Sequence, residues 1–374
     1  MKKTTRKEAR EKEGNIYYFA EFLKIKEHFF KDITKRLKSV KDTRHKSYIQ
    51  YEPDILLFSV ILKNICCLDS MTSMTDKFNK QECIENIAKA LGYDTLKELP
   101  HYDTINNFLC NLKNEELENI RDYMIKQLLK KRSLEDYRLL NKYWCIAIDA
   151  TGLFSFSERH CEHCLKKEFK EKDKKTGEKT GNIEKTVYYH NVLEAKIIIG
   201  EMVFSIATEF VENEDENVSK QDCEIKAFKR LEIKLKKQYP HLPICILGDS
   251  LYACEPVFKI CDKNKWKFLL RFKEGSIKSI AEEFNALKLI DGKRNEKCVW
   301  VRDVAYNERT VNVIEIDNAD RPNEKWVTDI SYIPTNQGFV YLSVIKDLYD
   351  KSIVAYRYGR EIWKCISTYS NLFY

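Results

Sequence analysis

Two aspartates each end a short apolar run of the sequence. Residues 144–148 precede Asp149, and residues 244–248 precede Asp249. Runs of this length, with β-branched residues and a small residue nearby, are typical of buried strands. A carboxylate at the end of a central strand costs free energy unless a partner compensates for it. Two such carboxylates on neighbouring strands would suit Mg²⁺ or Mn²⁺, which prefer oxygen ligands.

The order of the predicted elements favours this metal site over the simpler alternative, in which each aspartate is a turn residue or a helix N-cap. Strands are predicted at the positions before the two aspartates, at 187–200, at 202–210 and at 266–271. Helices are predicted at 219–239 and 255–263. Three antiparallel strands followed by strands reached through helices follow the ribonuclease H-like plan. The first and fourth strands are neighbours in that plan, so Asp149 and Asp249 are predicted to converge.

The composition of the chain restricts its partners and its location in the cell. The 374 residues carry a formal net charge of +7, which is compatible with a nucleic-acid partner. No stretch reaches the roughly 20 apolar residues of a membrane span, and the basic N-terminus lacks the apolar core of a secretory signal. The 13 cysteines are odd in number and lie in apolar runs. They predict reduced thiols and a cytoplasmic location. Because no apolar stretch is long enough to span a membrane, no membrane partner is expected.

The first 140 residues predict a helical region. A helix over 82–91 would end at Gly92, and Asp103 is the predicted N-cap of the helix that follows. Short helices rich in Lys and Arg could lie across a DNA duplex, with Thr104, Asn106 and Asn107 near base edges. The alternative is a packing domain whose charges are only solvated.

Several motifs resemble the catalytic half of bacterial insertion-sequence transposases of the DDE superfamily, over about residues 50–316. They are residues 147–152, 188–191, 220–224, 246–252 and 271–273. The resemblance implies metal-dependent DNA cleavage and strand transfer, with Asp149 and Asp249 as the first two metal-binding acids. It also implies that the helical region recognises the terminal repeats of an element as double-stranded DNA. A homo-oligomer is left open.

The sequence departs from that family after Arg271. The family's third acid is a glutamate on a late helix, in the pattern Tyr-x₂-Arg-x₃-Glu, and this pattern does not follow. Residues 276–318 look like the start of the β-rich insertion that precedes that helix. Residues 321–333 and 338–359 then resemble the start of a retroviral-integrase-type transposase core, in which Asp329 would be a first catalytic acid. Residues 360–374 match neither pattern.

We therefore expect a fusion, with one transposase interrupted near residues 317–321 by a piece of another. The predicted organisation is α/β (mixed). It consists of a helical DNA-binding region (1–140), a ribonuclease H-like core (141–275), a truncated β-rich insertion (276–318) and an integrase-like fragment with an unmatched tail (319–374). Glu361 is a conceivable third acid. The other core acids are interpreted as structural residues or as residues that surround the metal ligands without binding the metal, namely Glu209, Glu212 and Glu224.

The missing acid predicts that DNA binding persists while strand transfer is absent or very weak. The alternatives are a non-catalytic DNA- or zinc-binding remnant of the same fold, and a metal-dependent nuclease that cuts without joining. Four cationic side chains are candidates for phosphate contacts, namely Lys196, Lys220, Arg271 and Lys273. Tyr188 and Tyr252 could stack on a splayed base, although buried aromatic rings are the alternative.

A Cys-x-x-Cys with interleaved histidines follows the first aspartate strand. Cys161 and Cys164, with His163 or His190, could close a tetrahedral zinc site. No second Cys-x-x-Cys lies at standard spacing, so the alternative is a loop whose His and Arg side chains contact phosphate. The Lys-rich segment 166–185 is predicted to be a mobile insertion that closes on DNA phosphates, which would make binding sensitive to salt.

Overall fold

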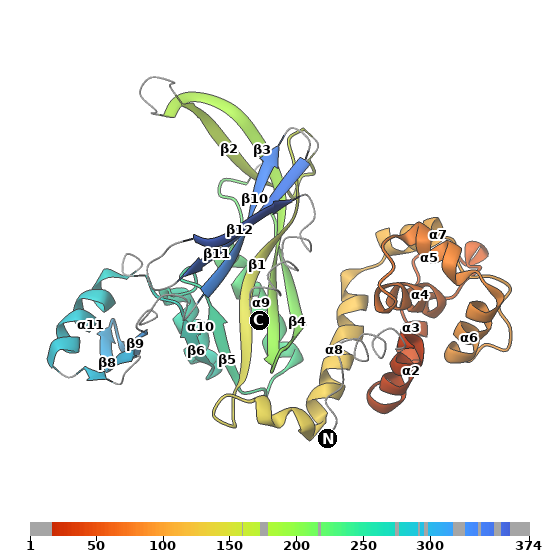
Figure 1. The fold of residues 1–374 in the computed structure, drawn as a ribbon, viewed down its shortest axis with the longest axis horizontal. Helices are drawn as coiled ribbons and strands as arrows, with labels where there is room; N and C mark the ends of the chain where they lie inside the picture. Colours follow the sequence, from red (N-terminus) through yellow and green to blue (C-terminus); the bar gives the residue numbers. More distant parts are fainter. Residues whose placement is uncertain are drawn as a thin grey trace. The chain divides into compact units, whose positions relative to one another are not determined.

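The computed structural model describes most of the chain (Figure 1). The described residues are 17–158, 160–172, 179–215, 218–273, 277–290, 292–294, 298–316, 326–335, 338–347 and 353–359. They divide into two compact units, Met1–Arg271 and Phe272–Tyr374. Arg159, the fusion point at 317–321, Glu361 and the tail lie outside the described residues.

The first part of unit 1 is helical, as predicted from its apolar periodicity. A shared core of buried apolar side chains, including Leu56, Phe58, Ile105 and Phe108, holds the helices together. Among the described residues, no helix has the length and apolar character needed to cross a membrane. The helices are α2 (Tyr18–Phe29), α3 (Ile33–Lys38), α4 (Pro53–Ile65), α5 (Met71–Phe78), α6 (Gln81–Leu91), α7 (Tyr102–Cys110) and α8 (Asn114–Lys130).

One of the two predicted helix caps is confirmed and the other is wrong. Gly92 follows α6 with a φ of 83°, a left-handed conformation that glycine adopts without a Cβ clash. The N-cap of α7 is His101, whose Nδ1 accepts the backbone N–H of Asp103. Asp103 lies inside the first helical turn, where its negative charge faces the positive end of the helix dipole.

The second part of unit 1 is built on a mixed sheet in which β3 pairs antiparallel with β1 and β4, while β1, β5 and β6 are parallel. The path β4-β3-β1-β5-β6 is the predicted ribonuclease H-like order, and β2 is an added strand on β3. The strands are β1 (Trp144–Phe156), β2 (Leu165–Lys172), β3 (Lys179–Ile199), β4 (Met202–Val211), β5 (Ile244–Gly248) and β6 (Lys267–Leu270).

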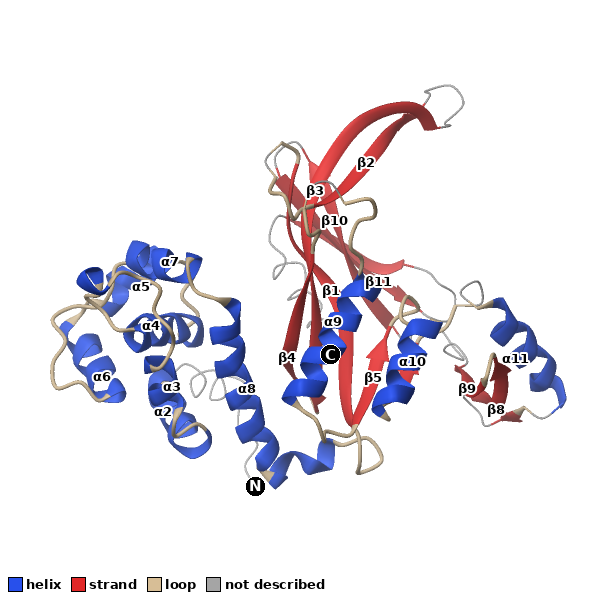
Figure 2. Cartoon of the chain, turned by 180° about the vertical axis from the view of Figure 1, so that it is seen from behind, coloured by secondary structure: helices blue, strands red, loops and turns tan. Residues whose placement is uncertain are grey.

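Two helices connect the strands of this half, α9 (Glu224–Gln238) before β5 and α10 (Glu255–Asn264) before β6. Figure 2 shows α9 lying along the sheet, and it contacts β3 and β4. Four of its apolar side chains are completely buried with those of the central strands, namely Ala227, Phe228, Leu231 and Leu235. The buried core therefore lies directly beneath the strand ends that carry the two aspartates.

Three details differ from the sequence prediction. Residues 166–172 and 179–185, predicted to be a mobile insertion, belong to the paired strands β2 and β3. Helix α9 begins at Glu224 rather than at residue 219. In the predicted β-rich insertion, α11 (Lys278–Ile290) precedes strands β7 (Lys293–Arg294), β8 (Cys298–Tyr306) and β9 (Arg309–Ile316).

The described residues of unit 2 form two three-stranded antiparallel sheets. In the first, β8 and β9 pack with α11 through Ile280, Phe284, Val301 and Val304. The second is a meander of β10 (Trp326–Thr335), β11 (Gly338–Asp347) and β12 (Ile353–Gly359). A meander is also how a ribonuclease H-like sheet begins. Asp329 lies on its first strand, with its backbone opposite Val344.

Replacing Gly248 with alanine is expected to destabilise unit 1. A Cβ at this position would lie 3.0 Å from a ring carbon of Tyr252 and 3.1 Å from a methyl carbon of Leu270. Both distances are tighter than ordinary packing, and overpacking a core typically costs about 1–3 kcal/mol. Chemical denaturation of the two proteins would measure the loss. Gly181→Ala is the matched control, because a Cβ there meets no atom within 4 Å.

Candidate metal centre

The parallel register of β1 and β5 brings the two aspartates to one edge of the sheet. Ala147 pairs with Leu247, and each aspartate lies two residues further along its own chain segment. Asp149 is still within β1, whereas Asp249 immediately follows β5. The carboxyl ends of parallel strands open on the same side of a sheet, and this is where α/β folds commonly place ligands.

Both carboxylates are exposed, so water compensates for their charge in place of a buried partner. Oδ1 of Asp149 accepts the backbone N–H of Ala150 at 2.9 Å. Oδ1 of Asp249 accepts the backbone N–H of Leu251 at 2.9 Å. Within the described part of the chain, neither aspartate forms an ion pair. Each local bond restrains its side chain and leaves Oδ2 for a ligand.

Glu224 is a third carboxylate whose charge interacts with those of this pair, and the sequence predicts for it a structural role or a place around the metal ligands. It is the first residue of α9, and Tyr252 donates its hydroxyl to Oε2 of Glu224 at 3.1 Å. Burial raises the pKa of the Glu224 carboxyl, and the negative charges of Asp149 and Asp249 raise it further. The three carboxylates therefore share one region of negative potential.

Tyr252 is completely buried at 0% exposure, beneath the carboxylates. Its ring packs edge-on against Phe228, with 5.8 Å between the ring centroids. Burial raises the pKa of its hydroxyl, as do the charges of the three acids. Of the two alternatives that the sequence leaves for Tyr252, the structure selects the buried aromatic ring over stacking on a DNA base, because the ring has no accessible face. Its role in the fold is to hold Glu224.

The oxygen donors suit a hard divalent cation in type, although among the described residues the oxygens of Asp149, Asp249 and Glu224 do not all lie within 4.8 Å of one another. Carboxylate oxygens are the protein ligands that Mg²⁺ and Mn²⁺ use together with water and phosphate. Burial raises the pKa of the Glu224 carboxyl, and repulsion by the charges of Asp149 and Asp249 adds to that shift. A bound cation would relieve that repulsion.

The residues just before Glu224 fasten this region to its neighbours. The Gln221 side chain accepts the backbone N–H of Lys166 and donates to the Lys166 carbonyl oxygen. Asp222 is paired with Arg230, with 2.7 Å between Oδ2 and Nη2. Arg230 also binds Glu209 at 2.7 Å, which identifies Glu209 as an ion-pair residue of the core. These contacts determine where α9 begins and therefore where Glu224 lies.

The predicted phosphate-contacting side chains have different surroundings. Lys196 is paired with Glu194, with 2.8 Å between Nζ and Oε2. Arg271 is exposed, and its backbone N–H donates to the Gly248 carbonyl oxygen at 3.0 Å. Arg271 therefore lies at the same edge of the sheet as Asp249. Lys220 and Lys273 are also exposed, and Lys273 belongs to unit 2.

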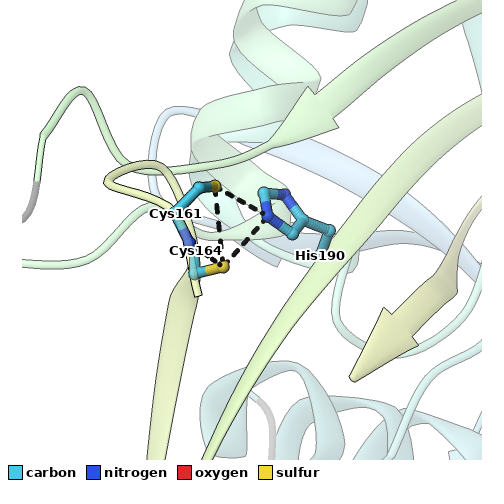
Figure 3. Close-up of side chains that lie close together, drawn as sticks. All are labelled: Cys161, Cys164 and His190. Atoms are coloured by element: carbon cyan, nitrogen blue, oxygen red, sulfur yellow. Dashed lines mark hydrogen bonds between the residues drawn. The ribbon is translucent and has the colours of Figure 1, made fainter. Parts of the chain in front are cut away.

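A second group of metal-ligating side chains is formed by the loop between β1 and β2 and by the facing part of β3 (Figure 3). Cys161 Sγ, Cys164 Sγ and His190 Nε2 all lie within 4.8 Å of one another. His163, the alternative imidazole, is not part of this group. Its Nδ1 lies 2.9 Å from the carbonyl oxygen of Asn213. The structure thus selects His190 from the two histidines that the sequence had left open.

Comparisons with known proteins give partial matches. No known protein-family profile matches the chain. A segment of 50 residues is 46% identical to an uncharacterized transposase-like protein of Haemophilus influenzae, over 13% of this chain and 23% of that protein. A segment of 46 residues is 39% identical to transposase InsF for insertion sequence IS3A of Escherichia coli, over 12% and 16%. The resemblance to insertion-sequence transposases is confirmed by these matches.

The chain spans less than a quarter of the length of these curated relatives. The Mos1 mariner paired-end complex with Mn is a solved structure that matches 67% of this chain and 71% of its own, at 14% identity. Its TM-score of 0.19 carries no argument about fold or function. The ribonuclease H-like plan rests instead on the strand order of this structure.

Proposed function

We propose that this chain is a transposase-type DNA-processing protein in which Asp149 and Asp249 hold Mg²⁺ or Mn²⁺. The observation that carries the proposal is the position of Asp149 and Asp249 at one edge of the sheet. The register of β1 and β5 brings the aspartates to one edge, and their charges raise the pKa of Glu224. A cytoplasmic location and a double-stranded DNA partner belong to the same proposal.

The bound cations would activate a hydroxyl nucleophile and stabilise the leaving oxygen of a phosphodiester. The protein's own contribution is to place the carboxylates. Backbone N–H groups restrain Asp149 and Asp249, and the buried Tyr252 restrains Glu224. Arg271 supplies an exposed positive charge at the same edge, where it can contact a DNA phosphate.

The proposal includes the composite origin of the chain. The IS3-type relatives match only 12–13% of it, at 39–46% identity, and leave the remainder unmatched. A short segment of another transposase joined to a different core would give this pattern. The late glutamate of the core's own family is absent from the sequence. Strand transfer is therefore expected to be absent or very weak, while DNA binding is retained.

Glu224 favours a second candidate function, a metal-dependent nuclease that cuts DNA without joining it. Its carboxylate lies near Asp149 and Asp249, although it comes from the helix before β5 and not from a late helix. A rearrangement that brings Glu224 to a cation held by Asp149 and Asp249 would complete a site for hydrolysis. Joining needs the additional placement of two DNA ends, which the expected loss of the late helix would impair.

A cleavage and joining assay tests the proposal. Duplex DNA from the flanks of the coding sequence is incubated with the full chain and Mg²⁺ or Mn²⁺. We expect DNA binding that weakens steeply with salt, little cleavage, and no joined product. Asp149→Asn should leave DNA binding unchanged.

Three outcomes would change this account. Absence of duplex binding at low salt would overturn the assignment to DNA. Robust joining that is lost in Asp149→Asn would overturn the expected impairment. Robust cleavage without joining that is lost in both Asp149→Asn and Glu224→Gln would establish the nuclease, with Glu224 as its third acid. In that last test, Glu255→Gln is the matched control on the first turn of α10.

A further inference from the structure

We propose that Cys161, Cys164 and His190 bind a structural zinc ion that fastens the loop between β1 and β2 to β3. This site is separate from the carboxylates of the proposed function, and it needs a different metal. Two thiolates and an imidazole are soft and borderline ligands, which select Zn²⁺ over Mg²⁺ or Mn²⁺. Two thiolate charges would also neutralise the charge of the ion.

The spacing of the three donor atoms matches tetrahedral zinc. Bonds of about 2.3 Å to sulfur and 2.0–2.1 Å to nitrogen place two sulfurs about 3.8 Å apart, and a sulfur and a nitrogen about 3.6 Å apart. The two Sγ atoms are 3.7 Å apart. His190 Nε2 lies 3.3 Å from Cys161 Sγ and 3.1 Å from Cys164 Sγ. A shift of a few tenths of an ångström in the ring would complete the geometry.

The position of the three residues in the fold explains what the ion would hold. Cys164 immediately precedes β2, and His190 lies on β3 opposite Phe154 of β1. The Phe154 ring packs against the imidazole, with 5.1 Å between the ring centroids. A zinc ion would therefore join the base of the β2–β3 hairpin to the outgoing end of β1. This junction lies on the same strand as Asp149.

Asn213 already orders the loop around the proposed ligands. Its side chain is buried, and Nδ2 donates to the carbonyl oxygen of Cys164 at 2.8 Å. Its backbone N–H donates to the carbonyl oxygen of His163 at 3.0 Å. Ligands held by surrounding hydrogen bonds lose less freedom when a metal binds, and this raises affinity. The same contacts keep His163 directed away from the sulfurs.

The loop is also connected to the carboxylate region. Oδ1 of Asn213 accepts the backbone N–H of Asp222, and Asp222 lies two residues before Glu224. Cys164 is buried and Cys161 is exposed, so the ion would have one open side. Water is the expected fourth ligand, because three protein donors leave one tetrahedral position.

Metal analysis of the purified full chain tests this proposal. The protein is prepared under reducing conditions, loaded with Zn²⁺, dialysed and assayed by plasma mass spectrometry. We expect one tightly held zinc per chain, which is lost in Cys161→Ser and in His190→Ala. His163→Ala is the matched histidine control and Cys110→Ser the matched exposed-cysteine control, and both should retain the ion.

Two further measurements keep the result independent of folding defects and of catalysis. X-ray absorption of the wild-type zinc protein should show two sulfur and two nitrogen or oxygen ligands. The double variant Asp149→Asn/Asp249→Asn should keep its zinc, which separates this site from the proposed function. A wild-type protein without zinc, a zinc shell without sulfur, or a Cys161–Cys164 disulfide in reduced preparations would overturn the proposal.

Discussion

Replacing both aspartates with asparagine is expected to abolish divalent-cation binding at the strand edge. Asparagine has nearly the same shape as aspartate but no charge, so the substitution removes the negative potential without creating a cavity. Substitution of residues that only support a metal ligand costs about 10–100-fold in affinity. Loss of both direct ligands should lower the affinity for Mn²⁺ by more than about 100-fold. Titration of Mn²⁺ into the full chain, followed by the loss of its free electron-spin resonance signal, measures the change.

The same pair of substitutions has a second expected effect. The charges of Asp149 and Asp249 raise the pKa of Glu224, so their removal should lower this pKa, with the contribution of burial remaining. Asp94→Asn is the matched control, because Asp94 is an exposed aspartate in the helical part of unit 1. Unchanged Mn²⁺ affinity in the double variant would contradict the assignment of these residues as metal ligands.

Replacing Phe228 with alanine is expected to have the largest effect on stability. Phe228 is 0% exposed and lies in the core between α9 and the sheet. Truncating a fully buried phenylalanine typically costs about 3–5 kcal/mol, because apolar contacts are lost and a cavity remains. The cavity would lie beside Tyr252. The support of Glu224 should therefore loosen as well.

Hydrogen exchange measured by mass spectrometry suits this test, since a chain of two compact units need not unfold in a single step. Peptides from β1, β5 and α9 should lose protection, whereas those from α11 and β8 should not. Phe228→Leu is the matched control. It should lower the free energy of unfolding by less than half as much as Phe228→Ala does, because it retains most of the buried volume. Protection unchanged in Phe228→Ala would contradict the position of this side chain.

The order of the strands could be predicted because their patterns are local. A few consecutive residues are enough to indicate each element, as in the apolar runs before Asp149 and Asp249 and in the turn at Gly200. Their pairing then follows from a plan with few alternatives. The arm formed by β2 and β3 was missed because its strands are rich in Lys and Glu. They resemble a loop in composition, and only pairing shows them to be strands.

Glu224 could not be identified as a neighbour of the aspartates from sequence alone. Its position depends on the exact start of α9. Two contacts determine that start, the hydrogen bond of Gln221 to Lys166 and the ion pair of Asp222 with Arg230. The available signal was an acidic residue entering a helix that returns toward the strand edge. The choice between His163 and His190 likewise depends on a contact between residues that are distant in the sequence. The contact of His163 with Asn213 decides it.

Anomalous diffraction from crystals of the full chain grown with Mn²⁺ tests the central claim most directly. The account predicts a manganese peak between the carboxylates of Asp149 and Asp249, with Glu224 beside it. It also predicts that this peak disappears in Asp149→Asn/Asp249→Asn crystals. A strand edge without manganese at a saturating concentration would contradict the claim. Manganese bound only at Cys161, Cys164 and His190 would contradict it equally.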